Sequence, residues 1–394
     1  MRRARPGFEL GFVALAVGIG AGPSACAAPR DSTGFSGDDV PDAGADATTA
    51  AGLDAASDAD AAPLEEQEAD LDGPTADAPS DAGPQYPPLR FSDIGPPVRI
   101  SGQFLFTEGP VWDPAKEVLY FTDINASTIY QLTLPDTITP FLKPTQNANG
   151  LALDPQGRLI VAGFASRTVE RVAGSSLQAI ATSYQGMPLN SPDDIIARSD
   201  GVIYFTDPVF GINGSQGLSK QTQDLSFEGV YRLTTDGTLH LEDQSMATPN
   251  GVELSPDERT LYVSFTTPGT IQEYSVAADG SLGSPTSFAS NVPVADSMCV
   301  DAAGNLYVAS LGGVAVFDPS GGLLGSIVCA IPGVTPDGAP TITAQIPTNC
   351  AFGAPDQKTL FITARSALGG TPVAGNASLF RVDNMPIPGL PGRP

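Results

Sequence analysis

Histidine and cysteine are scarce in this 394-residue chain, which carries one His and four Cys. The single imidazole, His240, lies in a stretch typical of a surface hairpin strand, so Ser-His-Asp and Cys-His catalysis is disfavoured. Four cysteines are too few for a disulfide scaffold in a chain of this length. Cys299, Cys329 and Cys350 fall in apolar predicted strands, and we interpret them as buried small hydrophobic residues rather than redox groups or metal ligands.

Positive charge is also scarce, since 19 Lys and Arg stand against 44 Asp and Glu and give a net charge of −25. A surface this acidic repels nucleic-acid phosphates, so we expect no nucleic-acid partner. The acidity suits either a cation-binding site or simple solubility. Long segments with apolar residues at a 3.6-residue period are missing as well, which argues against a helical domain.

Residues 1–26 have the features of an export signal. A basic start is followed by a short apolar run, Phe12 to Gly22, which is too short to span a bilayer comfortably. Small residues before Cys26 resemble a bacterial lipobox, which predicts a lipid anchor on the Cys26 thiol. Ala25-Cys26-Ala27 also fits ordinary signal cleavage. Both interpretations predict export, either as a periplasmic or cell-envelope lipoprotein or as a secreted protein.

Residues 27–86 are mostly Ala, Asp, Gly, Pro and Thr, and positions 31–85 hold 15 acidic residues and no Lys or Arg. Such a segment has too little apolar surface to offset the entropy cost of ordering, so we expect it to be a disordered linker. Two interpretations stay open. It is an acidic tether that holds a globular domain away from a membrane, or it is a dispensable tail.

A repeated unit organises residues 87–394. In each of six copies an oxygen-bearing polar residue leads into an apolar strand, and a second strand begins 10 or 11 residues later. These six leading residues are Glu108, Asn149, Asp193, Asn250, Asp296 and Asn349. Third strands follow in every copy. Six such repeats, with leading residues 41–57 positions apart, predict an all-β fold, a six-bladed β-propeller.

The sixth repeat ends after its third strand, whereas Pro97–Ile100 forms a predicted strand ahead of the first repeat. We therefore expect this N-terminal strand to complete the last blade and close the ring, which removes a free sheet edge. We expect the protein to be a monomer.

In a propeller the first strand of each blade lines the central channel, so the leading residues should converge at one mouth of that channel. Three carboxylates and three amides, with no Lys or Arg at these positions, are unfavourable together unless a cation lies among them. Oxygen ligands without His or Cys select Ca²⁺ or Mg²⁺ over zinc, and Ca²⁺ tolerates mixed ligation better. The alternative is that Asn and Asp simply suit strand–turn junctions.

Several stretches near the leading residues are distinctive in combination and run in order from about residue 100 to 383. They are Thr107–Trp112, Leu189–Asp194, Phe205–Pro208, Thr248–Val252, Ser255–Asp257 and Asp301–Tyr307. Together they resemble the gluconolactonase/regucalcin (senescence marker protein) family. The resemblance implies a six-bladed propeller with one divalent cation, usually Ca²⁺, at the channel mouth, and hydrolysis of sugar lactones and related esters.

Site residues follow from this resemblance. The metal ligands that it implies are Glu108, Asn250 and Asp296. It also puts Asp296 forward as the general base. Asp193 stands where most members have an Asn that touches the substrate or the metal-bound water, so Asp193 is a further candidate, as a ligand or as the base. The substrate-binding side chains that we expect at the same mouth are Asn149, Asp194 and Asn349.

Two further positions depart from the family pattern. Ser191 stands where some members place a substrate-binding Arg, and Phe164 where some bacterial relatives have His. These positions and Asp193 are expected at or near the substrate-facing rim, so the choice of substrate is affected more than metal binding.

The sequence thus predicts divalent-metal-dependent hydrolysis of a small-molecule lactone or ester, with Asp296 or Asp193 accepting a proton from the attacking water. Two alternatives stay open. One is an exported propeller that uses its metal to hold a ligand without turnover. The other is a related hydrolase that acts on phosphotriesters, aryl esters or other lactones.

Overall fold

The computed structural model describes residues 85–214, 216–335, 337, 339–366 and 375–392, all within the unit formed by residues 78–394. The predicted export signal, the lipid anchor at Cys26 and nearly all of the predicted linker lie outside the described residues. None of the helices in this part of the chain is long and apolar enough to cross a membrane. A three-residue 3-10 helix, η1 (Phe91–Asp93), precedes the first strand.

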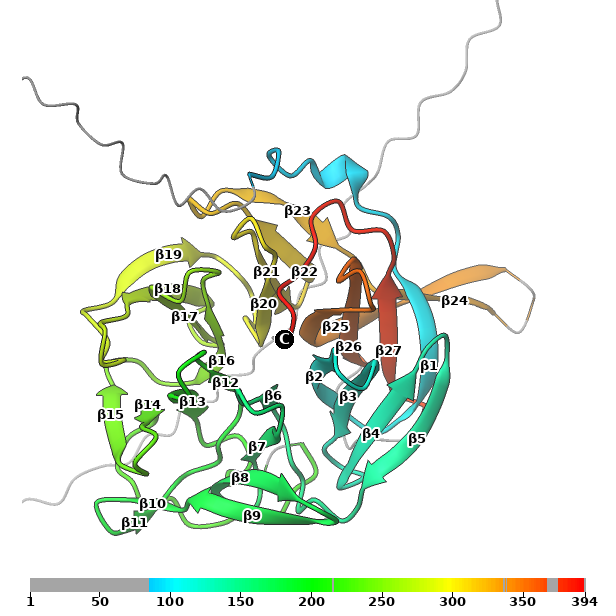
Figure 1. The fold of residues 1–394 in the computed structure, drawn as a ribbon. Helices are drawn as coiled ribbons and strands as arrows, with labels where there is room; N and C mark the ends of the chain where they lie inside the picture. Colours follow the sequence, from blue (N-terminus) through cyan, green and yellow to red (C-terminus); the bar gives the residue numbers. More distant parts are fainter. Residues whose placement is uncertain (1–84, 215, 336, 338, 367–374, 393–394) are drawn as a thin grey trace, which may run out of the picture. The chain divides into compact units, whose positions relative to one another are not determined.

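Six β-sheets surround a central channel and form the six-bladed propeller that the repeats predict (Figure 1). The first blade contains β2 (Thr107–Asp113), β3 (Val118–Asp123), β4 (Thr128–Thr133) and β5 (Thr137–Leu142). The second contains β6 (Leu151–Leu153), β7 (Leu159–Gly163), β8 (Thr168–Ala173) and β9 (Ser176–Ala181). The third contains β12 (Ile195–Ala197), β13 (Ile203–Asp207), β14 (Gly229–Leu233) and β15 (Leu239–Asp243), after a two-stranded ribbon of β10 (Ser183–Tyr184) and β11 (Met187–Pro188).

The remaining blades follow in chain order. The fourth contains β16 (Pro249–Leu254), β17 (Thr260–Phe265), β18 (Thr270–Ser275) and β19 (Thr286–Ser290). The fifth contains β20 (Met298–Val300), β21 (Leu306–Ser310), β22 (Gly313–Phe317) and β23 (Leu323–Ile327). The last contains β24 (Ala330–Val334), β25 (Pro340–Gly353), β26 (Thr359–Ser366) and β27 (Ala377–Val382), together with β1 (Val98–Phe104).

Each blade is buried on both faces, which explains why its inner strands are apolar throughout. In β13, Ile203 and Phe205 pack into one hydrophobic cluster, whereas Tyr204 packs into the next one. Successive side chains of a strand point to opposite faces, so one strand supplies the cores on both sides of its blade. The predicted burial of Cys299, Cys329 and Cys350 is confirmed, since all three have no exposed surface.

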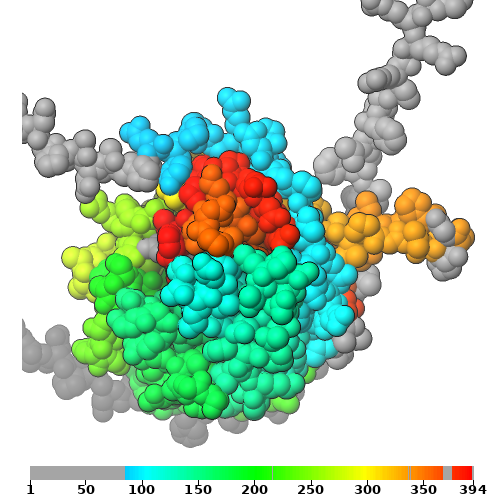
Figure 2. Space-filling view, turned by 45° about the vertical axis from the view of Figure 1, so that its right-hand side comes forward, coloured from blue at the N-terminus to red at the C-terminus, as the bar shows by residue number. Residues whose placement is uncertain are grey.

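The last blade differs from the others in two ways. β1 pairs antiparallel with β27, with Val98 opposite Arg381, so a strand from the start of the described region completes this sheet. β25 begins at Pro340 because its first part pairs with β24 in a hairpin that projects from the surface (Figures 1 and 2). The prediction that Asn349 stands at the start of its strand was therefore wrong, since Asn349 lies deep within β25.

Candidate active site

The leading residues of the six blades form a closed ring at one mouth of the channel, which we call the acidic mouth. Their side chains are between 3 % and 8 % exposed. Hydrogen bonds join neighbouring blades around most of this ring. They run from Gly150 N to Asp193 O (2.8 Å), from Thr206 Oγ1 to Asn250 O, from Ser264 Oγ to Asp296 O (2.7 Å), from Ser297 N to Thr348 O (3.1 Å) and from Thr348 Oγ1 to Thr107 O (2.7 Å).

Glycine follows the leading residue in three blades and lets the inner strands approach one another closely. A Cβ on Gly150 would lie 2.8 Å from the backbone of both Asp193 and Asp194, and a Cβ on Gly251 would lie 2.5 Å from Ser297 Cα. Gly109 adopts a φ of +49°, and a Cβ there would lie 2.4 Å from Asn149 O, which links the first blade to the second. The sequence pattern therefore brings all six leading residues together.

Four carboxylates share this mouth, and the pKa of each is raised above its ordinary value. Burial raises the pKa of Glu108 well above its ordinary value, and the charges of Asp296, Asp193 and Asp194 raise it further. The pKa of Asp193 is also raised well above the ordinary value, mainly by burial and then by Asp296. Burial raises the pKa of Asp296 to about 7 and that of Asp194 to about 6. Such a group of acids is destabilised when ionised unless a cation compensates it.

Two buried oxygens at the acidic mouth have no hydrogen-bond partner among the described residues. They are Oε2 of Glu108 and Oδ1 of Asn250, and both residues belong to the ligand set implied by the family resemblance. The other polar atom of the Asn250 side chain, its amide nitrogen, donates to Thr266 Oγ1 at 3.0 Å. The amide oxygen therefore points away from Thr266. Buried polar atoms without partners are costly, and oxygen donors suit Ca²⁺. These residues therefore fit a hard divalent cation.

The described residues contain no group of three or more His, Cys, Asp or Glu side chains arranged to hold a metal ion. The implied ligand set also includes the amide of Asn250, which is not one of these residue types.

The three side chains predicted to bind substrate also lie in or beside the ring, and each is hydrogen-bonded. Asn149 Nδ2 donates to Asp193 Oδ1 at 2.9 Å. Asp194 Oδ2 accepts from Val252 N at 3.1 Å, and hydrogen bonds from Ser297 and Asn349 partly offset the rise in its pKa that burial causes. Asp194 thus connects the third blade to the fourth, fifth and sixth blades. It has a structural role in addition to its position at the mouth.

Arg365 of β26 is a residue of this mouth that the sequence pattern did not identify. Its guanidinium carbon lies 5.8 Å from the ring centroid of Phe106, and its charge lowers the pKa of both Glu108 and Asp296. Thr363 pairs with Asn349, so Arg365, two residues further along β26, extends beyond the level of the ring. The sequence does contain one signal for Arg365, because it is a charged residue near the end of an otherwise uncharged second strand.

The two other departures from the family pattern are buried. Ser191 has no exposed surface, donates from its hydroxyl to Pro208 O at 2.5 Å and accepts from Gly211 N. Phe164 is also fully buried and packs with Phe106 and Ile124 in a small hydrophobic cluster. Neither side chain offers a free polar group to a ligand, and Phe164 supports the Phe106 ring that Arg365 covers.

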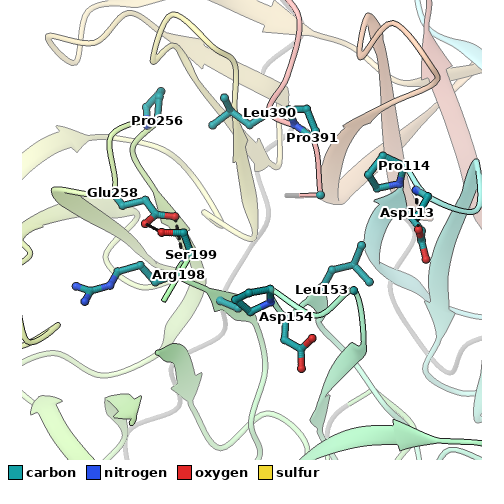
Figure 3. A pocket seen from close by; sticks show the side chains of 15 residues that line it. Asp113, Pro114, Leu153, Asp154, Arg198, Ser199, Pro256, Glu258, Leu390 and Pro391 are labelled. Carbon is teal, nitrogen blue, oxygen red and sulfur yellow. Dashed lines mark hydrogen bonds between the residues drawn. The ribbon is translucent and has the colours of Figure 1, made fainter. Parts of the chain in front are cut away.

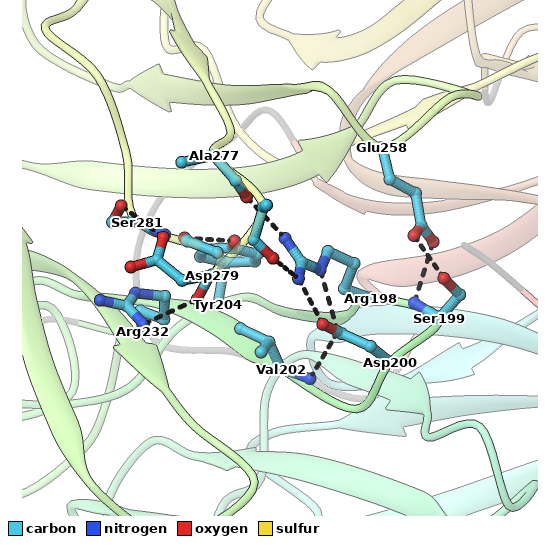
Figure 4. A network of polar contacts seen from close by, with 12 residues as sticks. Arg198, Ser199, Asp200, Val202, Tyr204, Arg232, Glu258, Ala277, Asp279 and Ser281 are labelled. Atoms are coloured by element: carbon cyan, nitrogen blue, oxygen red, sulfur yellow. Dashed lines mark hydrogen bonds and ion pairs between the residues drawn. The ribbon is translucent and has the colours of Figure 1, made fainter.

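A hollow of about 450 Å³ lies at the opposite ends of the inner strands, away from the leading residues (Figure 3). It is lined by turns of four blades and by the C-terminal segment Leu390–Gly392. Its charged groups are held by neighbouring turns, because Arg198 contacts Asp200, Ala277 O and Ala278 O, and Glu258 accepts from Ser199 N (Figure 4). This hollow is thus braced by turn contacts.

Comparisons with known proteins agree with this arrangement. The family model described as the SMP-30/Gluconolactonase/LRE-like region matches residues 106–366. The chain is 31% identical over 300 residues to the gluconolactonase of Zymomonas mobilis, covering 69% of this chain and 80% of that protein. It is 29% identical over 275 residues to lactonase drp35 of Staphylococcus saprophyticus, covering 65% and 79% of the two chains.

A solved structure gives the same result. The gluconolactonase of Xanthomonas campestris has a TM-score of 0.62 with this chain at 32% identity, covering 74% of this chain and 89% of that one. These matches confirm the family that the stretches around the leading residues indicated. The chain belongs to the SMP-30/gluconolactonase/LRE-like family.

Proposed function

We propose that the acidic mouth binds one divalent cation, Ca²⁺, and hydrolyses a sugar lactone. The observation that carries this proposal is the closed ring of buried leading residues, with four carboxylates and two unpartnered oxygens at the same mouth. Two relatives at 31% and 32% identity are gluconolactonases, which favours an aldonolactone over other esters as the substrate.

The cation would be held by Glu108, Asn250 and Asp296, with Asp193 as a fourth ligand or as a neighbour. Glu108 Oε2 and Asn250 Oδ1 are available because no other described group occupies them. A divalent cation bound there would polarise the lactone carbonyl and stabilise the negative charge that develops on its oxygen.

Asp296 accepts the proton of the attacking water in this proposal. Its pKa of about 7 suits a base that works near neutral pH, and a bound cation lowers that value. Asp193 opposes the lowering, because neighbouring carboxylates raise one another's pKa. The water oxygen bonds to the carbonyl carbon, the ring C–O bond breaks, and the proton held by Asp296 passes to the leaving alkoxide. The product is an open-chain hydroxy acid.

Arg365 would recognise the carboxylate that this reaction creates. It is a cation placed over Phe106 at the edge of an otherwise acidic mouth. An aldonate carries a negative charge that the ring carboxylates repel, and a guanidinium at the rim compensates that repulsion.

Export of the protein is a separate proposal that rests on residues 1–26. A basic start followed by a short apolar run and small residues supports it. Fractionation of cells that produce the full chain tests it. Protein found only in the cytoplasm, with an intact N-terminus, would contradict export.

Lactone turnover by the full chain tests the proposed function. D-glucono-1,5-lactone, other aldonolactones, an aryl ester and a phosphotriester are assayed with added Ca²⁺ and again with a chelator. We expect aldonolactone hydrolysis above the spontaneous rate that the chelator abolishes and Ca²⁺ restores. Asp296→Asn should lower kcat by about 10²–10⁴-fold at saturating Ca²⁺. Asp113→Asn, at the opposite end of β2, is the matched control and should retain activity. Calcium binding without turnover of any substrate would instead support the binding-module alternative.

A further inference from the structure

We propose that Cys299 and Cys350 form a disulfide bond that links the fifth blade to the last one. Cys299 lies in β20 and Cys350 in β25, and these are the inner strands of the two blades. Their sulfur atoms lie 2.7 Å apart, and both side chains are fully buried. This bond is independent of the proposed catalytic function.

The sulfur separation is too short for two thiols that merely pack together. Carbon atoms in contact already lie about 3.5–4.0 Å apart, and sulfur is larger than carbon. A disulfide brings its sulfurs to about 2.05 Å, so the observed approach lies between a packed pair and a bonded pair. Two strands that hold cysteines this close have already brought the partners together for the bond.

A third cysteine provides an internal comparison. Cys329 belongs to the same hydrophobic cluster and is also fully buried. Of the three cysteines in the described part of the chain, only Cys299 and Cys350 have sulfur atoms in contact with one another. Shared burial therefore does not explain the close pair, whereas the register of the two inner strands does.

The bond would form while the last blades assemble. Burial raises the pKa of the Cys299 thiol well above its ordinary value, so the closed core disfavours the thiolate that exchange requires. In the open chain, one thiolate attacks a sulfur of an external protein or small-molecule disulfide and forms a mixed disulfide. The second cysteine then attacks this mixed disulfide and releases the external group as a thiol. Two protons and two electrons leave the cysteine pair, and the external disulfide is reduced to two thiols.

The position of this bond gives it a specific consequence. It lies directly below the acidic mouth, because Cys350 N donates to Asn349 Oδ1 at 2.7 Å and Ser297 N donates to Thr348 O. It would fix the last blade, which contains strands from both ends of the described chain, to the blade before it. Closing a loop of about 50 residues stabilises the folded state mainly by restricting the unfolded chain.

Peptide mapping of the full chain tests the proposal. The protein is produced with export to an oxidising compartment, denatured in an alkylating reagent without reductant, digested and analysed by mass spectrometry. We expect a linked pair of peptides that contain Cys299 and Cys350, and an alkylated Cys329. Alkylation of all three cysteines without reductant would overturn the proposal, whatever the outcome of the lactonase assays.

Thermal unfolding provides a second readout. Protein refolded with a disulfide oxidant should have a Tm higher than protein refolded with a reductant by several degrees, about 5 °C or more. The difference should vanish in Cys350→Ala and persist in Cys329→Ala, which removes a buried cysteine from the same cluster. A difference that persists in Cys350→Ala would contradict the assignment.

Discussion

The side-chain amide of Asn149 donates a hydrogen bond of 2.9 Å to Oδ1 of Asp193, which joins the leading residues of two neighbouring blades. This bond fixes the orientation of the Asp193 carboxylate and favours its ionised form, because a donor stabilises negative charge. Burial and the charges of Asp296 and Asp194 act in the opposite direction and raise the Asp193 pKa well above its ordinary value. One neighbour therefore positions this carboxylate, and two others destabilise its charge.

Asp193→Asn should keep the fold and change either metal affinity or catalysis. The substitution is nearly isosteric, and its amide oxygen can still accept the bond from Asn149. If Asp193 is a ligand or its close neighbour, Ca²⁺ affinity should fall by roughly 10- to 100-fold. If Asp193 is the base, kcat should fall by roughly 10²–10⁴-fold at saturating Ca²⁺. Calcium titration and kinetics on this one variant distinguish the two roles. If both values are unchanged, Asp193 has neither.

The ring of leading residues could be predicted from the sequence because it depends on local pattern. Each leading residue stands a nearly constant distance before its second strand, and the strands alternate their side chains between two buried faces. That regularity identifies Glu108, Asn250 and Asp296 as residues of one mouth without any knowledge of long-range contacts.

The features that were missed depend on pairing between distant segments. The long β25 strand exists because β24 pairs with its first part, and no local signal shows that partner. Arg365 reaches the mouth because of the register of β26 against β25, in which Thr363 lies opposite Asn349, and the local sequence pattern does not show that register. The burial of Ser191 follows from its bond to Pro208 O, which sequence comparison with the family pattern does not show.

Arg365→Gln should weaken binding of the anionic product and shift the pH dependence of turnover. The loss of one partly exposed cation should raise product inhibition constants by about 2- to 5-fold. It should also move the acidic limb of the kcat/KM profile to higher pH, because Arg365 lowers the pKa of Glu108 and Asp296. Arg381→Gln, on the neighbouring strand β27, is the control and should change neither value. An unshifted profile in Arg365→Gln would remove this residue from the site.

Gly251→Ala should destabilise the protein because the fourth and fifth blades meet at this residue. The new Cβ would lie 2.5 Å from Ser297 Cα and 2.7 Å from Asp296 O, and both are backbone atoms that cannot rotate away. Crowding of this kind typically costs about 1–3 kcal/mol. Gly312→Ala introduces the same group where no heavy atom lies within 4 Å, so it should change stability by less than about 0.5 kcal/mol. Chemical denaturation of both variants measures the difference, and equal stabilities would contradict the close packing.

The stability of chelated protein should fall as pH rises through the range in which the acidic mouth ionises. Asp194 and Asp296 have pKa values raised to about 6 and about 7 from an ordinary 3.8, so the folded state holds protons that the unfolded state releases. Their stabilising contribution is complete below about pH 4 and is lost as pH rises through 6 to 7. Added Ca²⁺ should oppose the loss because it binds the ionised form. Tm at pH 5 and pH 8, with chelator and with Ca²⁺, measures this. Equal pH slopes under the two conditions would show that the cation does not bind these carboxylates.

A metal-dependent lactonase site is tested most directly by titrating Ca²⁺ into chelated full-length protein and following the return of activity. We expect aldonolactone hydrolysis to rise with Ca²⁺ occupancy and to saturate at one ion per chain. Glu108→Gln, which removes a charge from an oxygen donor without a partner, should need roughly 10-fold or more Ca²⁺ for half-maximal activity. Full activity of the chelated protein, or an unchanged calcium requirement in Glu108→Gln, would contradict a metal-dependent lactonase site at this mouth.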